Sequence, residues 1–193
     1  MPDIFDVMAE RRSVRRYSSE DVSEEDLNVI LEAACSAPSA GNLQAYEIVV
    51  VRDRRRRIEL ARASLNQMFM AQAPVHLVFL AYPRRSASIY GRRGARLYSL
   101  QDATIAAAFA MLAAHALGYG TCWVGAFHDE EVLRIVGAPD DRIPVAIITV
   151  GKPIGGGGHT TPRMGMELFV FEEVHGRPFR HIPVMRKLLR PGC

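Results

Sequence analysis

The sequence predicts a single α+β domain, and three observations support this prediction. Apolar residues recur at helical spacing in the segments 24–36 and 97–117. Short apolar runs typical of buried strands lie at 47–51, 75–82, 121–127 and 144–150. The chain has 193 residues, of which 49% are hydrophobic and 23% charged, and this composition suits one globular domain with a substantial core.

The first half of the chain is expected to contain three helices and two strands. A short amphipathic helix covers 5–10, and the capping-box pattern Ser23-Glu24-Glu25-Asp26 begins a second helix over 24–36. Pro38 ends that helix, because its ring disfavours helical geometry at the residue before it. After the strand 47–51, the arginine run 52–57 opens a third helix with inward-facing apolar residues, and a strand over 75–82 follows.

In the second half, a long Ala-rich helix is expected over 97–117. Its small residues allow another helix to approach closely, which suits a dimer interface, and Asp102 inside it requires a hydrogen-bonding partner. We interpret His115 as a core or interface histidine rather than a catalyst. The segment 83–94 has four arginines, two glycines and no apolar periodicity, so a surface loop is expected there. A helix over 129–136 separates the last two strands, and residues 168–171 could form a further strand.

Two segments carry the chemical information. The loop after Pro38 offers hydroxyl and amide groups without charge, which suits a flat neutral heterocycle bound through hydrogen bonds at its edge. It is equally consistent with an ordinary helix-to-strand connection. The segment 11–15 places three guanidinium groups and a hydroxyl within five residues, a set that can hold a phosphate from several sides. Read together, the two segments describe a site for flavin mononucleotide (FMN).

At this point the chain resembles the FMN-dependent nitroreductase family. Four motifs stand in the family's order: RRSVRRY at 11–17, APSAGNLQAY at 37–46, GYGTCWVGAF at 118–127 and ITVGKP at 148–153. The resemblance extends to about Arg163. It implies a nitroreductase-like sandwich, in which a mixed, mainly antiparallel β-sheet is flanked by helices. It also implies a homodimer with FMN at the subunit interface and loop residues that cross between subunits.

The resemblance assigns the cofactor-binding residues. Those expected at the FMN phosphate and ribityl chain lie near the N-terminus, with Arg163 as a second phosphate ligand. Asn66 and the loop residues are expected at the ring edge, and the backbone of 122–125 at one face of the ring. The full set is Arg11, Arg12, Ser13, Arg15, Pro38, Ser39, Ala40, Asn42, Gln44, Asn66, Cys122, Trp123, Val124, Gly125 and Arg163. Where the family usually has a basic residue and a proline, this chain has Thr161 and Ala45, so the clamp and the loop are expected to be looser.

No catalytic acid, nucleophile or metal ligand is expected, because FMN would carry the redox chemistry at its N5 atom. NADH or NADPH would be a transient electron donor, since no GxGxxG dinucleotide motif follows a strand. A nitroaromatic, quinone or similar conjugated acceptor would then take the electrons by a ping-pong mechanism. A second interpretation keeps the fold but changes the reaction, because some relatives in this family dehalogenate their substrates, dehydrogenate peptide heterocycles or fragment the flavin itself.

The remaining function classes are less well supported. A nucleic-acid or anion-binding protein that uses Arg52 to Arg57 and Arg84 to Arg96 is the third interpretation. No aromatic residues alternate with the arginines of 52–57, however, and the net charge is only +3. The three cysteines are widely spaced, which predicts reduced thiols and a cytoplasmic protein. The segment 103–127 is uncharged but breaks at Gly118 and Gly120, so we expect a core helix and a strand rather than a membrane span. We expect one domain over 1–193, with 166–193 as a less typical C-terminal extension.

Overall fold

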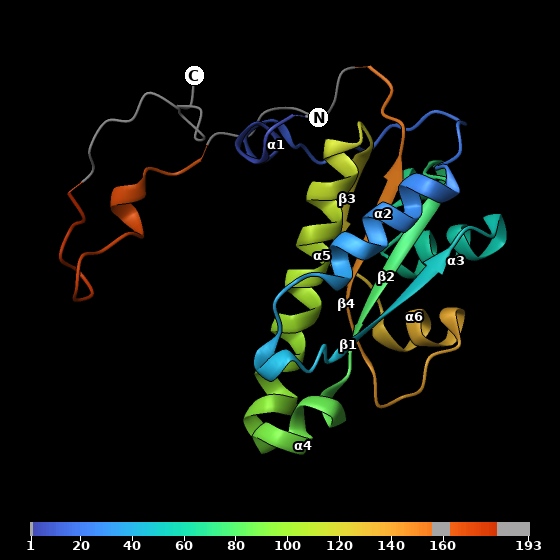
Figure 1. Cartoon of the computed structure of the whole chain (residues 1–193). Coiled ribbons are helices and arrows are strands. Elements are labelled where there is room, and N and C mark those ends of the chain that lie inside the picture. The colour runs from blue at the N-terminus through green and yellow to red at the C-terminus, as the bar shows by residue number, and fades with distance from the viewer. Residues whose placement is uncertain (1, 156–162, 181–193) are drawn as a thin grey trace.

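The computed structural model describes residues 2–155 and 163–180 and has a four-stranded sheet at its centre (Figure 1). The strands are β1 (Tyr46–Val51), β2 (Val75–Ala81), β3 (Gly120–Val124) and β4 (Ile143–Gly151), in the order β1-β2-β4-β3. All three pairings are antiparallel. A parallel bridge joins Ser13 to Thr121 beside the outer strand β3, and Val14 N donates to Thr121 O over 2.8 Å. The predicted α+β fold is confirmed.

Helices cover both faces of the sheet, as alternate strand residues require. Leu77 and Phe79 of β2 pack on the side of α2 (Glu24–Cys35) and α5 (Ser99–Ala116). Val78 and Leu80 pack on the opposite side with α3 (Arg54–Ala63) and α6 (Asp129–Val136). Successive side chains in a strand point to opposite faces, so two apolar cores form, and β2 is buried along its whole length. The helices and strands predicted in these regions are confirmed to within three residues at their ends.

Several helix ends are capped, and the cap at Ser23 is the one that the sequence predicts. Ser23 Oγ accepts from the backbone N of Asp26 and begins α2, and Asp3 Oδ1 accepts from Phe5 N and Asp6 N at the start of α1 (Ile4–Glu10). Asp53 does the same at α3, and Gly137 adopts φ +69° after α6.

The prediction of a surface loop at 83–94 was wrong. The structure has α4 (Pro83–Arg93), then a π-helical turn at Gly94–Tyr98 that runs directly into α5. Pro83 stands at the first helical turn, where its missing N–H costs nothing. Gly94 lies so close to Ser86 that a β-carbon would come within 2.5 Å of the Ser86 carbonyl oxygen. The turn after α4 therefore packs closely against the start of the same helix.

Two further regions bear on the predictions. The expected strand at 168–171 is instead a short 3-10 helix, Met166–Leu168, followed by an isolated bridge from Phe171 to Pro178. In Figure 1 the part of this C-terminal segment that holds the 3-10 helix and the bridge stands away from the body of the molecule. The continuous helical stretch Pro83–Ala116 is long and apolar enough to cross a membrane, but a helix packed in a protein core passes the same test, and α5 packs on the sheet.

Candidate functional site

The loop between α2 and β1 is held in a special backbone conformation. Gly41, Asn42 and Gln44 have φ of +57°, +57° and +42°, which only glycine adopts without strain. Gln44 N donates to Ser39 Oγ over 3.0 Å, and the Gln44 side-chain amide donates to the Asn42 carbonyl over 2.6 Å. Three left-handed residues in four positions indicate a segment shaped for binding rather than an ordinary connection.

Asp102 of α5 holds both ends of this loop. Its Oδ1 accepts from Ala40 N over 2.9 Å, and its Oδ2 accepts from Ala45 N over 3.2 Å. The carboxylate is only 2% exposed, so these two bonds are its polar environment among the described residues. The partner that the sequence required for Asp102 is thus the backbone of the predicted ring-binding loop.

Helix α4 contacts the same loop from the other side. Arg85 Nη1 donates to the Gln44 carbonyl over 2.6 Å. A β-carbon at Gly41 would overlap the hydroxyl of Tyr90, so the tyrosine occupies the space that the glycine leaves. Beside the loop lies an open hollow of about 590 Å³, lined by Pro38, Ser39, Ala40, Tyr98, Leu100, Gln101, Asp102, Thr104 and Ile105. Sequence reasoning missed Arg85 and Tyr90 as neighbours of the loop, because it did not predict α4.

The predicted phosphate ligands gather at β3. Arg11 is half-buried, and its Nη1 is buried without a hydrogen-bond partner. Burial, followed by the nearby charges of Arg163 and Arg12, lowers the pKa of Arg11 below its usual value. A buried guanidinium N–H with no acceptor, surrounded by further positive charge, fits an anionic oxygen such as that of a phosphate. FMN therefore suits the residues present.

The other predicted phosphate ligands differ in the contacts that they already make within the chain. Arg15 is exposed, with its guanidinium 5.8 Å from the centre of the Phe69 ring. Ser13 is fixed by its bridge to Thr121. Arg12 instead closes the end of α1, because its Nη1 donates to the carbonyls of Ala9 and Arg11 over 2.7 and 2.8 Å. We therefore expect Arg12 to contribute less to a phosphate than Arg11 or Arg15.

Some of the predicted ring-binding residues lie on the β3 side, where Cys122 is near Arg11 and Arg15 of the predicted phosphate ligands. Asn66 is exposed in a tight turn with φ +58°, and the next residue, Gln67, donates to the Ala126 carbonyl over 3.4 Å. Cys122 is buried, and burial raises the pKa of its thiol, while the charges of Arg15 and Arg11 oppose that rise. Gly125 leaves room for the indole of Trp123, whose Nε1 would lie 3.3 Å from a β-carbon there.

One chain does not bring the two groups together. The loop is hydrogen-bonded to Asp102 near the start of α5. Arg11 and Arg12 lie near His115, toward the end of α5, where burial lowers the pKa of His115 and the charges of the two arginines add to that effect. Thirteen residues of helix at 1.5 Å each separate these two points by roughly 20 Å. Figure 1 shows the loop, in light blue, at one end of α5 and α1, in dark blue, at the other.

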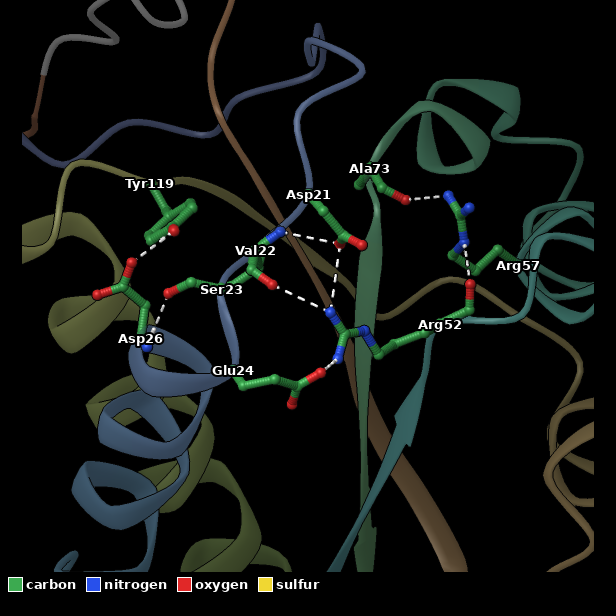
Figure 2. A network of polar contacts seen from close by, with 9 residues as sticks. All are labelled: Asp21, Val22, Ser23, Glu24, Asp26, Arg52, Arg57, Ala73 and Tyr119. Carbon is green, nitrogen blue, oxygen red and sulfur yellow. Dashed lines mark hydrogen bonds and ion pairs between the residues drawn. The ribbon is translucent and has the colours of Figure 1, made fainter.

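The run 52–57 is largely engaged in internal contacts (Figure 2). Arg52 pairs with Glu24, contacts Asp21 at 3.5 Å and donates to the Val22 carbonyl over 3.0 Å. Arg57 donates to the carbonyls of Arg52, Ala71 and Ala73. These contacts join the starts of α2 and α3 to the residues that precede β2. Arg52 and Arg57 therefore have structural roles, which weakens the nucleic-acid interpretation.

Comparison with known proteins identifies the family. The nitroreductase family model matches residues 8–79 and 59–152. The chain belongs to the nitroreductase family. It is 32% identical over 157 residues to an Archaeoglobus fulgidus protein named "putative NADH dehydrogenase/NAD(P)H nitroreductase", covering 79% of this chain and 87% of that one. It is 30% identical over 166 residues to an "FMN reductase [NAD(P)H]" of Bacillus subtilis, covering 79% of this chain and 67% of that one.

Solved structures agree with this assignment. The NfrA2 structure from B. megaterium superposes with a TM-score of 0.82 at 28% identity, and the match covers 91% of this chain and 76% of that one. The "hypothetical oxidoreductase YcnD" of Bacillus subtilis gives the same TM-score and identity, covering 90% of this chain and 75% of that one. The family resemblance of the four motifs is confirmed.

Proposed function

We propose that this nitroreductase is an FMN-dependent oxidoreductase that transfers electrons from NADH or NADPH to a small conjugated acceptor. The observation that supports FMN most directly is the buried Arg11 Nη1, which has no acceptor within the described chain and lies among like charges. Relatives named as FMN reductases and NAD(P)H nitroreductases support the same cofactor and donor. FMN supplies hydride and electron transfer when it is bound.

The chain's own residues would hold and orient that cofactor. Arg11, Ser13, Arg15 and Arg163 would bind the phosphate, and Asn66 with the backbone of 122–125 would bind one side of the ring. Pro38, Ser39, Ala40, Asn42 and Gln44 would supply the remaining polar edge. Cys122 would contribute through its backbone only, because burial raises the pKa of its thiol and keeps it protonated.

A second copy of the chain would complete the site. Since the loop and the arginine group lie about 20 Å apart along α5, the loop of one protomer would meet the arginine group of its partner. Exposed apolar residues could form such an interface, including Phe109 of α5 and Ile4 and Met8 of α1. The apolar extension 163–180, with Leu168 62% and Phe169 54% exposed, would also be covered in the dimer. The free thiols of Cys35 and Cys122 support a cytoplasmic location.

The acceptor is proposed to be a nitroaromatic, a quinone or a related conjugated molecule that binds after the oxidised nicotinamide leaves. Parallel reciprocal plots of rate against each substrate would support this ping-pong order. Intersecting plots would contradict it. Reduction of bound flavin without turnover of any such acceptor would favour one of the other reactions carried out on this fold.

The cofactor assignment is tested with the purified protein. Flavin absorbance bands that bleach on anaerobic addition of NADH or NADPH are expected. The double variant R11A/R15A should weaken FMN binding at least tenfold, because each charge-assisted bond contributes about 1.5–3 kcal/mol. The matched control R54A/R56A removes two exposed arginines of α3 and should leave FMN affinity unchanged. A colourless protein that takes up no added FMN would contradict the proposal.

A further inference from the structure

Three arginines at the junction of α4 and α5 have no acidic partner among the residues that the structure describes. Arg92, Arg93 and Arg96 are exposed within five residues, and in the region that the structure describes none of them lies within ion-pair distance of a carboxylate. Their neighbours differ, because Arg84 contacts Asp141 at 3.7 Å and Arg85 donates to the Gln44 carbonyl. Like charges one turn apart on a helix repel one another, so an anion bound among these arginines would relieve that repulsion.

An aromatic pair connects these arginines to the hollow beside the predicted ring loop. Arg93 Nε donates to the Tyr98 hydroxyl over 2.9 Å, with the guanidinium 5.5 Å from the Tyr98 ring centre. Tyr98 lines the hollow of about 590 Å³ together with Pro38, Ser39 and Ala40. Tyr90 packs edge-on against Tyr98, with ring centres 5.2 Å apart at 84°, and its hydroxyl fills the space at Gly41. Guanidiniums and aromatic rings therefore meet at one rim of the hollow.

We propose that Arg92, Arg93 and Arg96 bind the phosphate monoester of a nucleotide that docks at this hollow. A phosphate monoester carries close to two negative charges near pH 7, and guanidinium groups match its oxygens in pairs. The Tyr90 and Tyr98 rings offer an apolar surface to the base beside it. The inference rests on the proposed function, and it assigns the site to the 2′-phosphate of NADPH, which NADH lacks. The chain would accordingly prefer NADPH.

The test compares two triple variants of the full-length, FMN-loaded protein. R92A/R93A/R96A removes the proposed site. R54A/R55A/R56A removes three exposed arginines from α3, on the opposite face of the sheet, and serves as the matched control. The ratio of KM for NADPH to KM for NADH should rise at least about tenfold in the first variant and stay constant in the second. Calorimetric binding of adenosine 2′,5′-bisphosphate, with adenosine 5′-monophosphate for comparison, provides a readout independent of turnover.

The outcomes separate the possible sources of the phosphate. A rise in KM for free FMN as electron acceptor, with the NADPH to NADH ratio unchanged, would assign the site to the acceptor's phosphate and overturn the NADPH assignment. Unchanged bisphosphate affinity in R92A/R93A/R96A, with a lower melting temperature, would reduce these arginines to a structural role at the end of α4. Either result leaves flavin binding and bleaching intact, whereas failure of the proposed function would appear as a loss of flavin from the unmodified protein.

Discussion

The buried Asp102 carboxylate should control both stability and cofactor binding. Replacement by Ala leaves Ala40 N and Ala45 N without their acceptor. Hydrogen bonds to a charged group contribute about 1.5–3 kcal/mol each, so D102A should lose at least about 3 kcal/mol of unfolding free energy. For a chain of this size that corresponds to a fall of roughly 6–12 °C in the melting temperature. D102N keeps one acceptor oxygen and should lose about half as much.

The assay is thermal and urea unfolding at one fixed protein concentration, followed by FMN titration of each variant by flavin fluorescence. Fixed concentration matters because assembly would stabilise the folded chain. FMN affinity should fall in the order wild type, D102N, D102A, because the loop carries the predicted ring contacts. D140A, which removes an exposed carboxylate near the start of β4, is the control and should change neither quantity. If D102A unfolds within about 0.5 kcal/mol of wild type, then Asp102 does not hold the loop and the reasoning is refuted.

Three other perturbations test separate parts of the structure. G41A should destabilise the protein by about 1 kcal/mol or more, because φ is +57° and the new methyl overlaps the Tyr90 hydroxyl; G41A/Y90F should recover part of this loss in thermal unfolding, and no recovery would disprove the contact. Burial lowers the pKa of His76 to about 4, so in this pH range the unfolded chain binds a proton that the folded chain does not. The free energy of unfolding should therefore fall by about 3 kcal/mol as the pH drops from about 6.5 to 4. H76Q, whose amide can still donate to the Met70 carbonyl, should show a flatter urea-unfolding profile over that range, and an unchanged slope would count against this origin. R142K should unfold more easily than wild type in low salt. Arg142 donates to both carboxylate oxygens of Glu47, at 2.6 and 3.0 Å, and its guanidinium stacks 3.5 Å from the Tyr82 ring centre. Equal urea-unfolding midpoints for R142K and wild type would show that this two-bond contact contributes nothing.

The sequence was informative where local chemistry decides the structure. The Ser23 cap, the stop before Pro38 and the buried run of β2 all follow from nearest-neighbour physics, and the structure has each of them. Helix α4 could not be predicted in this way, because Arg85 and Tyr90 contact Gln44 and Gly41, which lie far away in the sequence. Pro83 at its first turn was the available local signal, whereas the fit of Gly94 against Ser86 depends on the folded chain.

The sequence predicts a cofactor class for the site but not the arrangement of its residues. Guanidinium groups and a neutral polar loop indicate FMN, but sequence spacing carries no information on which end of α5 each occupies. Asp102 illustrates the difference. Its need for a partner followed from a charge inside an apolar helix, yet the identity of that partner, the backbone at both ends of the loop, required the three-dimensional structure.

The distance between the loop and the arginine group has a genetic consequence. If each site combines the loop of one protomer with the arginines of the other, two differently damaged chains can compensate for each other. In a mixed dimer of an R11A chain and a D102A chain, one site carries both defects and the other carries neither. Random exchange of subunits between the two purified proteins should therefore restore about one site in four, although neither protein alone retains an undamaged one.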